Sequence, residues 1–154
     1  MFSLIVSIIS IALVAVLAAA SIYYGGDAFT KGSAKALAST VVTQAQQISS
    51  ANTLFKNDNG GVSATNVTAL VTGKYLASEP AIPSKVGTVN LAINATGDGV
   101  EAAITNGEVC KLINQQAAGQ DTFSTAAQYG CQAAAGVDAT LGTADDVLTF
   151  KYKG

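Results

Sequence analysis

The chain has 154 residues, of which 49% are hydrophobic and only 12% are charged, about half the charged share of an ordinary soluble domain. It contains no histidine, arginine or tryptophan, which excludes Ser-His-Asp and Cys-His catalysis, histidine metal sites and arginine forks for phosphate. Because its carboxylates also offer no paired acid and base, we expect that the protein is not an enzyme. Lysine is the only cation and the formal charge is −2, so we expect no nucleic-acid site.

Charged residues are absent from residues 1–26, and all eighteen of them lie between Asp27 and Lys153. Residues 1–24 are long enough, at about 1.5 Å per residue in a helix, to cross a hydrocarbon layer roughly 30 Å thick. We therefore expect this segment to enter a bilayer at some stage. A secretory signal peptide is the alternative, since Ala18-Ala19-Ala20 resembles a cleavage site. Such a peptide begins with positive charge and this segment does not, so we expect it to remain in the mature protein.

Three serines of this segment, Ser3, Ser7 and Ser10, are spaced so that they share one face of a helix. Small hydroxylated residues allow helices to approach one another closely in apolar surroundings, which favours a helix–helix contact on this face. The alternative is that serine is merely tolerated in a membrane span.

The helical pattern continues after the charges begin. From Ser33 to Phe55 apolar residues recur every three or four positions and polar residues occupy the opposite face, which predicts an amphipathic helix. A single helix over about residues 2–55 is therefore expected, apolar all round in its first half and one-sided in its second. Gly25 and Gly26 interrupt it, and because glycine costs about 1 kcal/mol in a helix interior they are the expected place for a kink or local unwinding. The alternative there is an ordinary loop between a membrane anchor and a domain.

The rest of the chain predicts short elements, beginning with a turn at residues 57–61 that ends the long helix. The later signals predict a helix over 66–72 with Gly73 as its left-handed stop, a strand over 88–94 joined by a turn at 96–99 to a strand over 100–104, a helix from Asn106 to Gly119, and a last strand over 147–153 with its lysines outward. The expected fold class is α+β: a long N-terminal helix packed by its second half against a small antiparallel sheet with short helices. We divide the chain into a hydrophobic helix over 1–26 and a globular head over 27–154 that includes the amphipathic half of the helix.

Cys110 and Cys131 are the only cysteines, and they enclose 20 residues. In an oxidising compartment a disulfide between them would stabilise the fold by about 3 kcal/mol in the chain-entropy account. The alternative is two buried free thiols, since one pair of cysteines without histidine is too few for a structural zinc site.

The order of these features resembles that of the type IV pilins, exported subunits that polymerise into a helical filament through their N-terminal helix. The apolar stretch that begins Met1-Phe2 resembles a mature pilin after removal of its short leader. Gly25-Gly26 lies near the region where pilin helices are loosened in filaments.

Two later segments carry the same resemblance. Residues 70–76 and the prolines that follow them are similar to the segment that pilins place between the long helix and the sheet. Residues 110–114, with Gly130-Cys131, are similar to the C-terminal disulfide region of the type IVb group. The likeness therefore covers most of the chain and implies a type IV pilin-like fold.

The resemblance implies a subunit of a bacterial filament with functions such as adhesion or motility. Its precursor would lie in the inner membrane and the assembled protein outside the cell, with other copies of the chain and the pilus assembly machinery as partners. The surface that lipid covers in the precursor would then be buried against neighbouring helices in an open helical polymer. The residues expected in this polymerisation core are Phe2, Leu4, Ile5, Ile8, Ile9, Ile11, Leu13, Val14, Val16, Leu17 and Ile22.

One position departs from the family pattern. Pilins generally have glutamate as the fifth mature residue, where it is thought to pair with a neighbouring subunit's N-terminal amine, and the fifth residue of this chain is Ile5. If Met1 is the mature start, docking needs another device, for which main-chain groups, Ser3 and Ser7 are the candidates. The alternative is that Met1 is a translation start and the resemblance is less exact. The alternatives within the family are a pseudopilin of a secretion system, a minor pilin and a conjugative pilin. Outside it, the alternative is a membrane-anchored binding domain, with or without calcium, whose first segment is only a tether.

A weaker resemblance lies in residues 138–146, which are similar to an acidic Gly-Thr-x-Asp-Asp loop of some exported proteins, pseudopilins included. Asp138, Asp145 and Asp146, with main-chain carbonyls, supply the kind of oxygen ligands that calcium requires. The alternative is a solvated acidic turn, and no other cofactor is expected.

Overall fold

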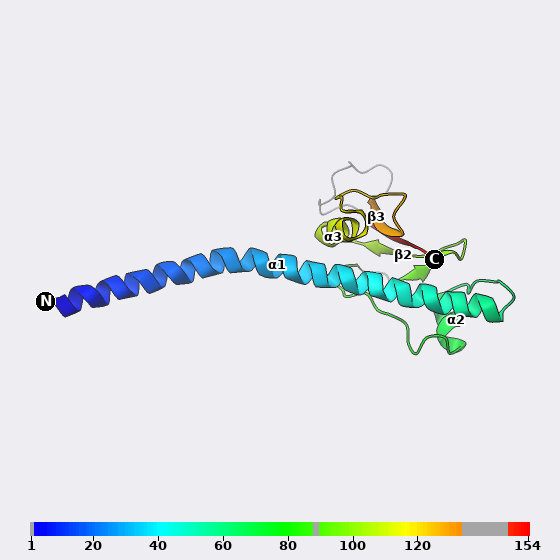
Figure 1. Cartoon of the computed structure of the whole chain (residues 1–154). Coiled ribbons are helices and arrows are strands. Elements are labelled where there is room, and N and C mark those ends of the chain that lie inside the picture. Colours follow the sequence, from blue (N-terminus) through cyan, green and yellow to red (C-terminus); the bar gives the residue numbers. More distant parts are fainter. Residues whose placement is uncertain (1, 88–89, 134–147) are drawn as a thin grey trace. The chain divides into compact units, whose positions relative to one another are not determined.

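The computed structural model describes residues 2–87, 90–133 and 148–154. Its elements follow the order α1 (Phe2–Asp58), α2 (Val67–Thr72), β1 (Ala92–Ile93), β2 (Gly99–Ile104), α3 (Gly107–Ala118), β3 (Tyr129–Ala133) and β4 (Leu148–Lys153) (Figure 1). The chain divides into two compact units, residues 1–33 and residues 34–154, and α1 contributes to both. The expected α+β class, with a long apolar N-terminal helix and a small antiparallel sheet, is confirmed.

The helix α1 ends at Asp58, three residues beyond the expected end. It passes through Gly25, Gly26 and Gly32 without a break, so the alternative of a loop at this point is wrong and the expected unwinding is not present. A Cβ built on Gly25 or Gly32 meets no atom within 4 Å, so crowding inside this chain does not require glycine at either position. Loosening of this stretch on assembly stays a prediction.

The four described strands pair antiparallel in the order β1-β2-β4-β3. The C-terminal strand β4 therefore lies between β2 and β3 and pairs with both. As expected, its apolar residues are buried, and Lys151 and Lys153 are exposed on the opposite face. The strand β1 is shorter than expected, since it covers only Ala92–Ile93, and residues 88–89 lie outside the described residues.

The second half of α1 packs on the sheet and α3 in one hydrophobic cluster. Its buried members recur at helical spacing on one face, which confirms the predicted amphipathic pattern; they are Ala38, Val41, Val42, Ala45, Ile48 and Ala51. The sheet and α3 supply most of the remainder, among them Val100, Ile104, Val109, Ile113, Leu148 and Phe150. Residues 34–154 thus bury a core of their own.

The short helix α2 is capped by Asn66, whose side-chain oxygen accepts a hydrogen bond from the Ala69 N–H at 2.8 Å. The expected left-handed stop at Gly73 is wrong: Gly73 has a φ of −74°, and the left-handed residue is Lys74, with a φ of 64°. Gly73 instead permits a close approach, because a Cβ there would lie 2.8 Å from Cε2 of Tyr75. The glycine therefore serves packing and not backbone conformation.

Tyr75 connects the segment after α2 to the end of α1. Its ring meets Phe55 edge-on, with 5.5 Å between ring centroids, and its hydroxyl donates a hydrogen bond to Oδ2 of Asp58 at 2.7 Å. Because the neutral hydroxyl is the donor, this bond raises the pKa of Tyr75 above its ordinary value of 10.0. The contact holds the returning chain against the helix that precedes it.

The helix α3 begins after the cap Asn106 and ends at the left-handed Gly119, as expected. The disulfide Cys110–Cys131 joins it to β3, so the expected bridge is present and the alternative of free thiols is wrong. Asn114 adds a second link and is only 1% exposed. Its Nδ2 donates to the carbonyl oxygen of Cys131 at 3.0 Å, and its Oδ1 accepts from the Cys131 N–H at 2.7 Å.

The strand β3 has no counterpart among the expected elements. Glycine and alanine are poor strand formers, and Gly130 is the second residue of this strand. The structure explains this glycine, because a Cβ at Gly130 would lie 2.7 Å from Cδ2 of Phe123. Local sequence therefore disfavours a strand that pairing with β4 imposes.

Candidate functional site

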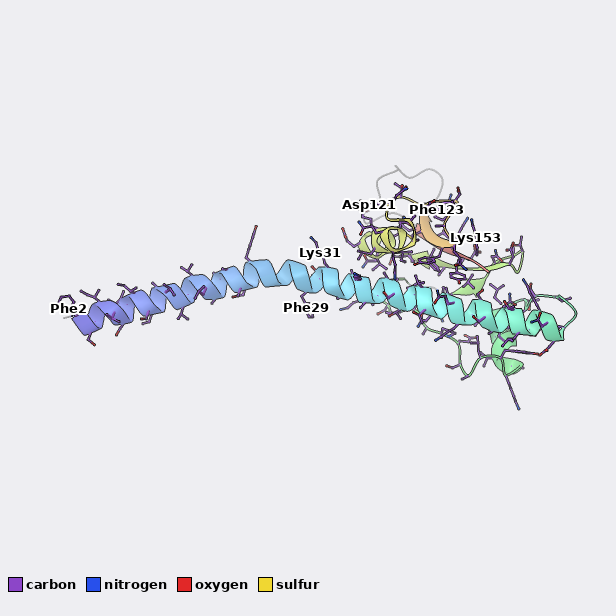
Figure 2. The ribbon with its side chains drawn as sticks, viewed as in Figure 1. Phe2, Phe29, Lys31, Asp121, Phe123 and Lys153 are labelled. Carbon is purple, nitrogen blue, oxygen red and sulfur yellow. A yellow bond between two sulfur atoms is a disulfide. The ribbon has the colours of Figure 1, made fainter. Side chains whose placement is uncertain are left out.

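The surface of α1 from Phe2 to Tyr23, named the apolar surface, is the candidate functional site. All of its 22 residues are exposed, and its large hydrophobic side chains range from 53% exposed at Ile5 to 87% at Phe2. Figure 2 shows these side chains projecting all round the helix. Among the described helices this is the one long and apolar enough to cross a membrane, although a signal sequence would satisfy the same criterion.

Every residue expected in the polymerisation core lies on this surface. The structure leaves all of them exposed: Phe2, Leu4, Ile5, Ile8, Ile9, Ile11, Leu13, Val14, Val16, Leu17 and Ile22. Val6 was not among the expected residues, and it is exposed in the same way. Their burial in an assembly stays a prediction.

Three of the four serine hydroxyls of the apolar surface are satisfied inside the helix by donation to the carbonyl four residues earlier. The bonds are Ser7 to Ser3 at 2.9 Å, Ser10 to Val6 at 2.8 Å and Ser21 to Leu17 at 2.9 Å. Because each hydroxyl has one proton and uses it within the helix, apolar surroundings leave none of these three donors unpaired. Ser7 therefore can act toward a neighbouring subunit only as a hydrogen-bond acceptor while this bond is kept.

The three aspartates of the candidate calcium loop, Asp138, Asp145 and Asp146, lie outside the described residues. Within the part of the chain that the structure describes, no group of three or more histidine, cysteine, aspartate or glutamate residues is placed to hold a metal ion. The calcium interpretation therefore stays a prediction.

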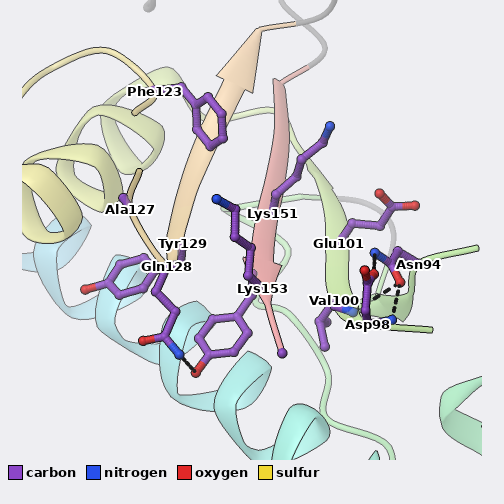
Figure 3. Close-up of a pocket in the computed structure, with 13 residues that line it drawn as sticks. Asn94, Asp98, Val100, Glu101, Phe123, Ala127, Gln128, Tyr129, Lys151 and Lys153 are labelled. Carbon is purple, nitrogen blue, oxygen red and sulfur yellow. Dashed lines mark hydrogen bonds between the residues drawn. The ribbon is translucent and has the colours of Figure 1, made fainter. Parts of the chain in front are cut away.

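A groove of about 380 Å³ lies on the sheet face that carries Lys151 and Lys153 (Figure 3). Lys153 Nζ donates a hydrogen bond to the carbonyl oxygen of Thr125, which ties the segment before β3 to β4. Glu101 of β2 is the register partner of Lys151, so opposite charges stand on neighbouring strands. No sequence signal predicted this groove, because its walls come from segments far apart in the chain.

At one end of the groove, Asp98 is held by the turn between β1 and β2. The side chains of Thr96 and Asn94 both donate to its carboxylate, and these bonds lower the pKa of Asp98 below its ordinary value of 3.8. Asn94 also accepts hydrogen bonds from the backbone N–H groups of Asp98 and Gly99. The carboxylate therefore serves the turn, and the groove as a whole carries both signs of charge.

No family model matches this chain, and no curated protein and no solved structure shows significant similarity to it. The functional conclusion therefore rests on the geometry of the chain itself. The features that bear on it are the exposed apolar surface, the separate core of residues 34–154 and the disulfide.

Proposed function

We propose that this chain is a structural subunit that polymerises through its N-terminal helix into an extracellular filament of the type IV pilus kind. The observation that carries the proposal is the contrast between an apolar surface exposed along all of its 22 residues and the part of the head over residues 34–154, which has a core of its own. Exposed apolar surfaces of this extent mark contacts with lipid or with other proteins. Lipid would cover the apolar surface in the precursor, and other copies of the chain would cover it in the filament.

Burial of the apolar surface would hold assembled subunits together against dissociation into water. A helix of this size removes on the order of 1,500 Å² of apolar area from water, worth roughly 35 kcal/mol at about 25 cal/mol per Å² as an upper bound. This exceeds the cost of association, which is estimated at about 4–15 kcal/mol. A head-to-tail contact between identical copies that does not close generates an open helical filament.

The precursor state is supported by the same residues. At about 1.5 Å per residue, the apolar surface matches a hydrocarbon layer of roughly 30 Å, and its three internally bonded serines bring no unpaired hydroxyl into it. The disulfide between Cys110 and Cys131 is of the kind that persists in an oxidising compartment. A head placed outside the inner membrane fits both observations.

Negative-stain microscopy of material sheared from cells that express the full chain tests this proposal. The expected result is uniform thin fibres that an antibody against the head labels along their length. A preparation with detergent-soluble monomer and no fibres would contradict the proposal and leave a membrane-anchored domain in its place.

Added bulk on the helix separates a filament subunit from a tethered domain. Ala12→Phe and Ser7→Leu keep the segment apolar, so a tether tolerates both changes. A packed filament core does not, because overpacking costs about 1–3 kcal/mol at a site and the site recurs in every subunit. We expect both variants to insert into the membrane and to form few fibres, whereas the volume-conserving control Leu17→Ile assembles.

A further inference from the structure

Phe29 is a large apolar side chain that lies beyond the apolar surface. It is six positions after Tyr23, about 9 Å further along a helix, and it is 80% exposed. It also follows Ile22 by seven positions, so the two side chains lie on the same face of α1. Phe29 therefore continues one face of the apolar surface by two turns and is not an isolated exposed residue.

Membrane hydrocarbon does not account for this side chain. The apolar surface already has the length that a hydrocarbon layer accepts, and Asp27 stands between Tyr23 and Phe29 in the sequence. Phe29 would enter the layer only if a carboxylate entered it first, which is unfavourable. A protein surface, unlike the hydrocarbon layer, can cover Phe29 without burying that carboxylate.

The opposite side of this stretch is charged. Figure 2 shows Lys31 projecting from α1 on the side away from Phe29. Lys35 follows Lys31 by four positions and shares its face, and α1 has no acidic residue between Asp27 and Asp58 to compensate the two charges. The apolar ring and the two lysines thus lie on different sides of this stretch.

We propose that Phe29 packs on the apolar surface of a second copy of this chain, displaced along the filament axis. This inference rests on the proposed function, in which parallel copies are related by a helical displacement. Apart from Ala28 and the counterpart of Phe29 itself, residues 25–33 of a copy in register would offer the ring only glycine, serine, threonine and charged groups, whereas residues 2–23 offer large apolar side chains along their whole length. Contact with that range requires an axial displacement of at least about 9 Å and at most about 40 Å.

Cysteine cross-linking in filaments tests the contact. Both native cysteines are in the disulfide, so added thiols react without a native competitor. Phe29→Cys is co-expressed with a series of differently tagged variants that place one cysteine at each position from Leu4 to Ile22, and sheared filaments are oxidised. Lys31→Cys replaces Phe29→Cys in the matched control, because Lys31 projects from the other side of the helix.

We expect mixed disulfides from Phe29→Cys at one or two positions that share a helical face, and much weaker ones from Lys31→Cys. Filaments in which Phe29→Cys chains cross-link only to one another, or form no mixed dimer at any position, would overturn the inference and leave the filament proposal intact. Absence of fibres from the native chain is a separate result, since it removes the proposed function itself. If Phe29→Cys blocks assembly, it is supplied as a minor fraction among native copies.

Assembly of purified chain gives a second readout that needs no added cysteine. Loss of a buried phenylalanine ring is expected to raise the critical concentration for assembly by about 10- to 100-fold in Phe29→Ser, while Phe29→Leu recovers most of the native behaviour. Lys31→Ser should assemble as the native chain does. Equal critical concentrations for Phe29→Ser and the native chain would show that no second copy covers the ring.

Discussion

The two halves of α1 belong to one continuous helix and differ completely in burial. In the first half apolar side chains surround the helix and all of residues 2–23 are exposed, whereas in the second half they occupy one face and Val41, Ala45 and Ile48 are fully buried. What separates the halves is the distribution of apolar residues around the axis. A one-sided stripe is satisfied by a single packed layer, but a helix that is apolar all round needs cover on every side, which lipid or a bundle of other helices supplies.

Two isoleucines of the same helix give the largest test of this comparison. Ile48 is fully buried and Ile9 is 59% exposed. Ile48→Ala should lower the free energy of unfolding of the head by about 4 kcal/mol, because the truncated side chain leaves a cavity in the core. Ile9→Ala should leave that free energy within about 0.5 kcal/mol of native, since the described part of the chain leaves this side chain mostly exposed. Denaturant unfolding of the full chain in detergent, followed by a signal from the head, measures both.

When filament yield is measured, the order of the two effects should reverse, with the larger loss in Ile9→Ala. Ile9→Ala removes apolar area from the assembly contact in every subunit and should reduce sheared fibre, while any Ile48→Ala chain that folds retains the complete apolar surface. A head destabilised equally by both substitutions would show that the two halves of α1 are not distinct in the way their exposure indicates.

Sequence periodicity predicted what depends on neighbours along the chain. The extent of α1, the one-sided pattern of its second half, and both ends of α3 at Asn106 and Gly119 follow from local spacing and capping residues, and all are present. The alternation of β4 was equally readable, since each second residue faces the core.

What sequence did not predict depends on contacts between distant residues. The strand β3 contains Gly130, which is unfavourable locally and is required by the ring of Phe123. Gly73 was assigned to a left-handed stop because glycine is common there, but its absent side chain makes room for Tyr75. For the candidate site, the sequence placed all the expected core residues on one helix. The structure adds that the described part of the chain leaves every one of them exposed.

The disulfide provides a test of the stability of the head alone. Reduction of Cys110–Cys131 should lower the free energy of unfolding by about 3 kcal/mol, because the unfolded chain regains the conformational entropy that the closed loop removes. The measurement is denaturant unfolding with and without reductant. The double variant Cys110→Ala/Cys131→Ala is the control and should not respond to reductant. A response in that variant would mean that reductant acts elsewhere.

Asn114 gives a smaller effect on the same link between α3 and β3. Asn114→Ala should cost about 2 kcal/mol, because the backbone N–H and carbonyl of buried Cys131 both lose their partner. The neighbouring Gln115→Ala is a matched control, since Gln115 is exposed and its side-chain amide donates to the exposed Asp121 side chain. Its expected cost is under about 0.5 kcal/mol. Equal losses in the two variants would remove the special role of the buried amide.

The smallest effect is expected from acid, and it too separates the two regions. Residues 2–23 carry no carboxylate, whereas the head carries Asp98, whose pKa is lowered by hydrogen bonds from Thr96 and Asn94. A carboxyl with a lowered pKa in the folded state contributes stability that is present above its ordinary value of 3.8 and is lost as pH falls through the lower, folded value. The head should therefore lose a small increment of stability below about pH 4, kept small by solvent around this exposed group. Asp98→Asn keeps the shape of the turn without the titration, so its unfolding midpoint should fall less steeply than that of the native chain as the pH is lowered from about 5 to about 2. If the two profiles coincide, the turn at Asp98 does not couple protonation to folding, and the acid response of the head arises at its other carboxyls.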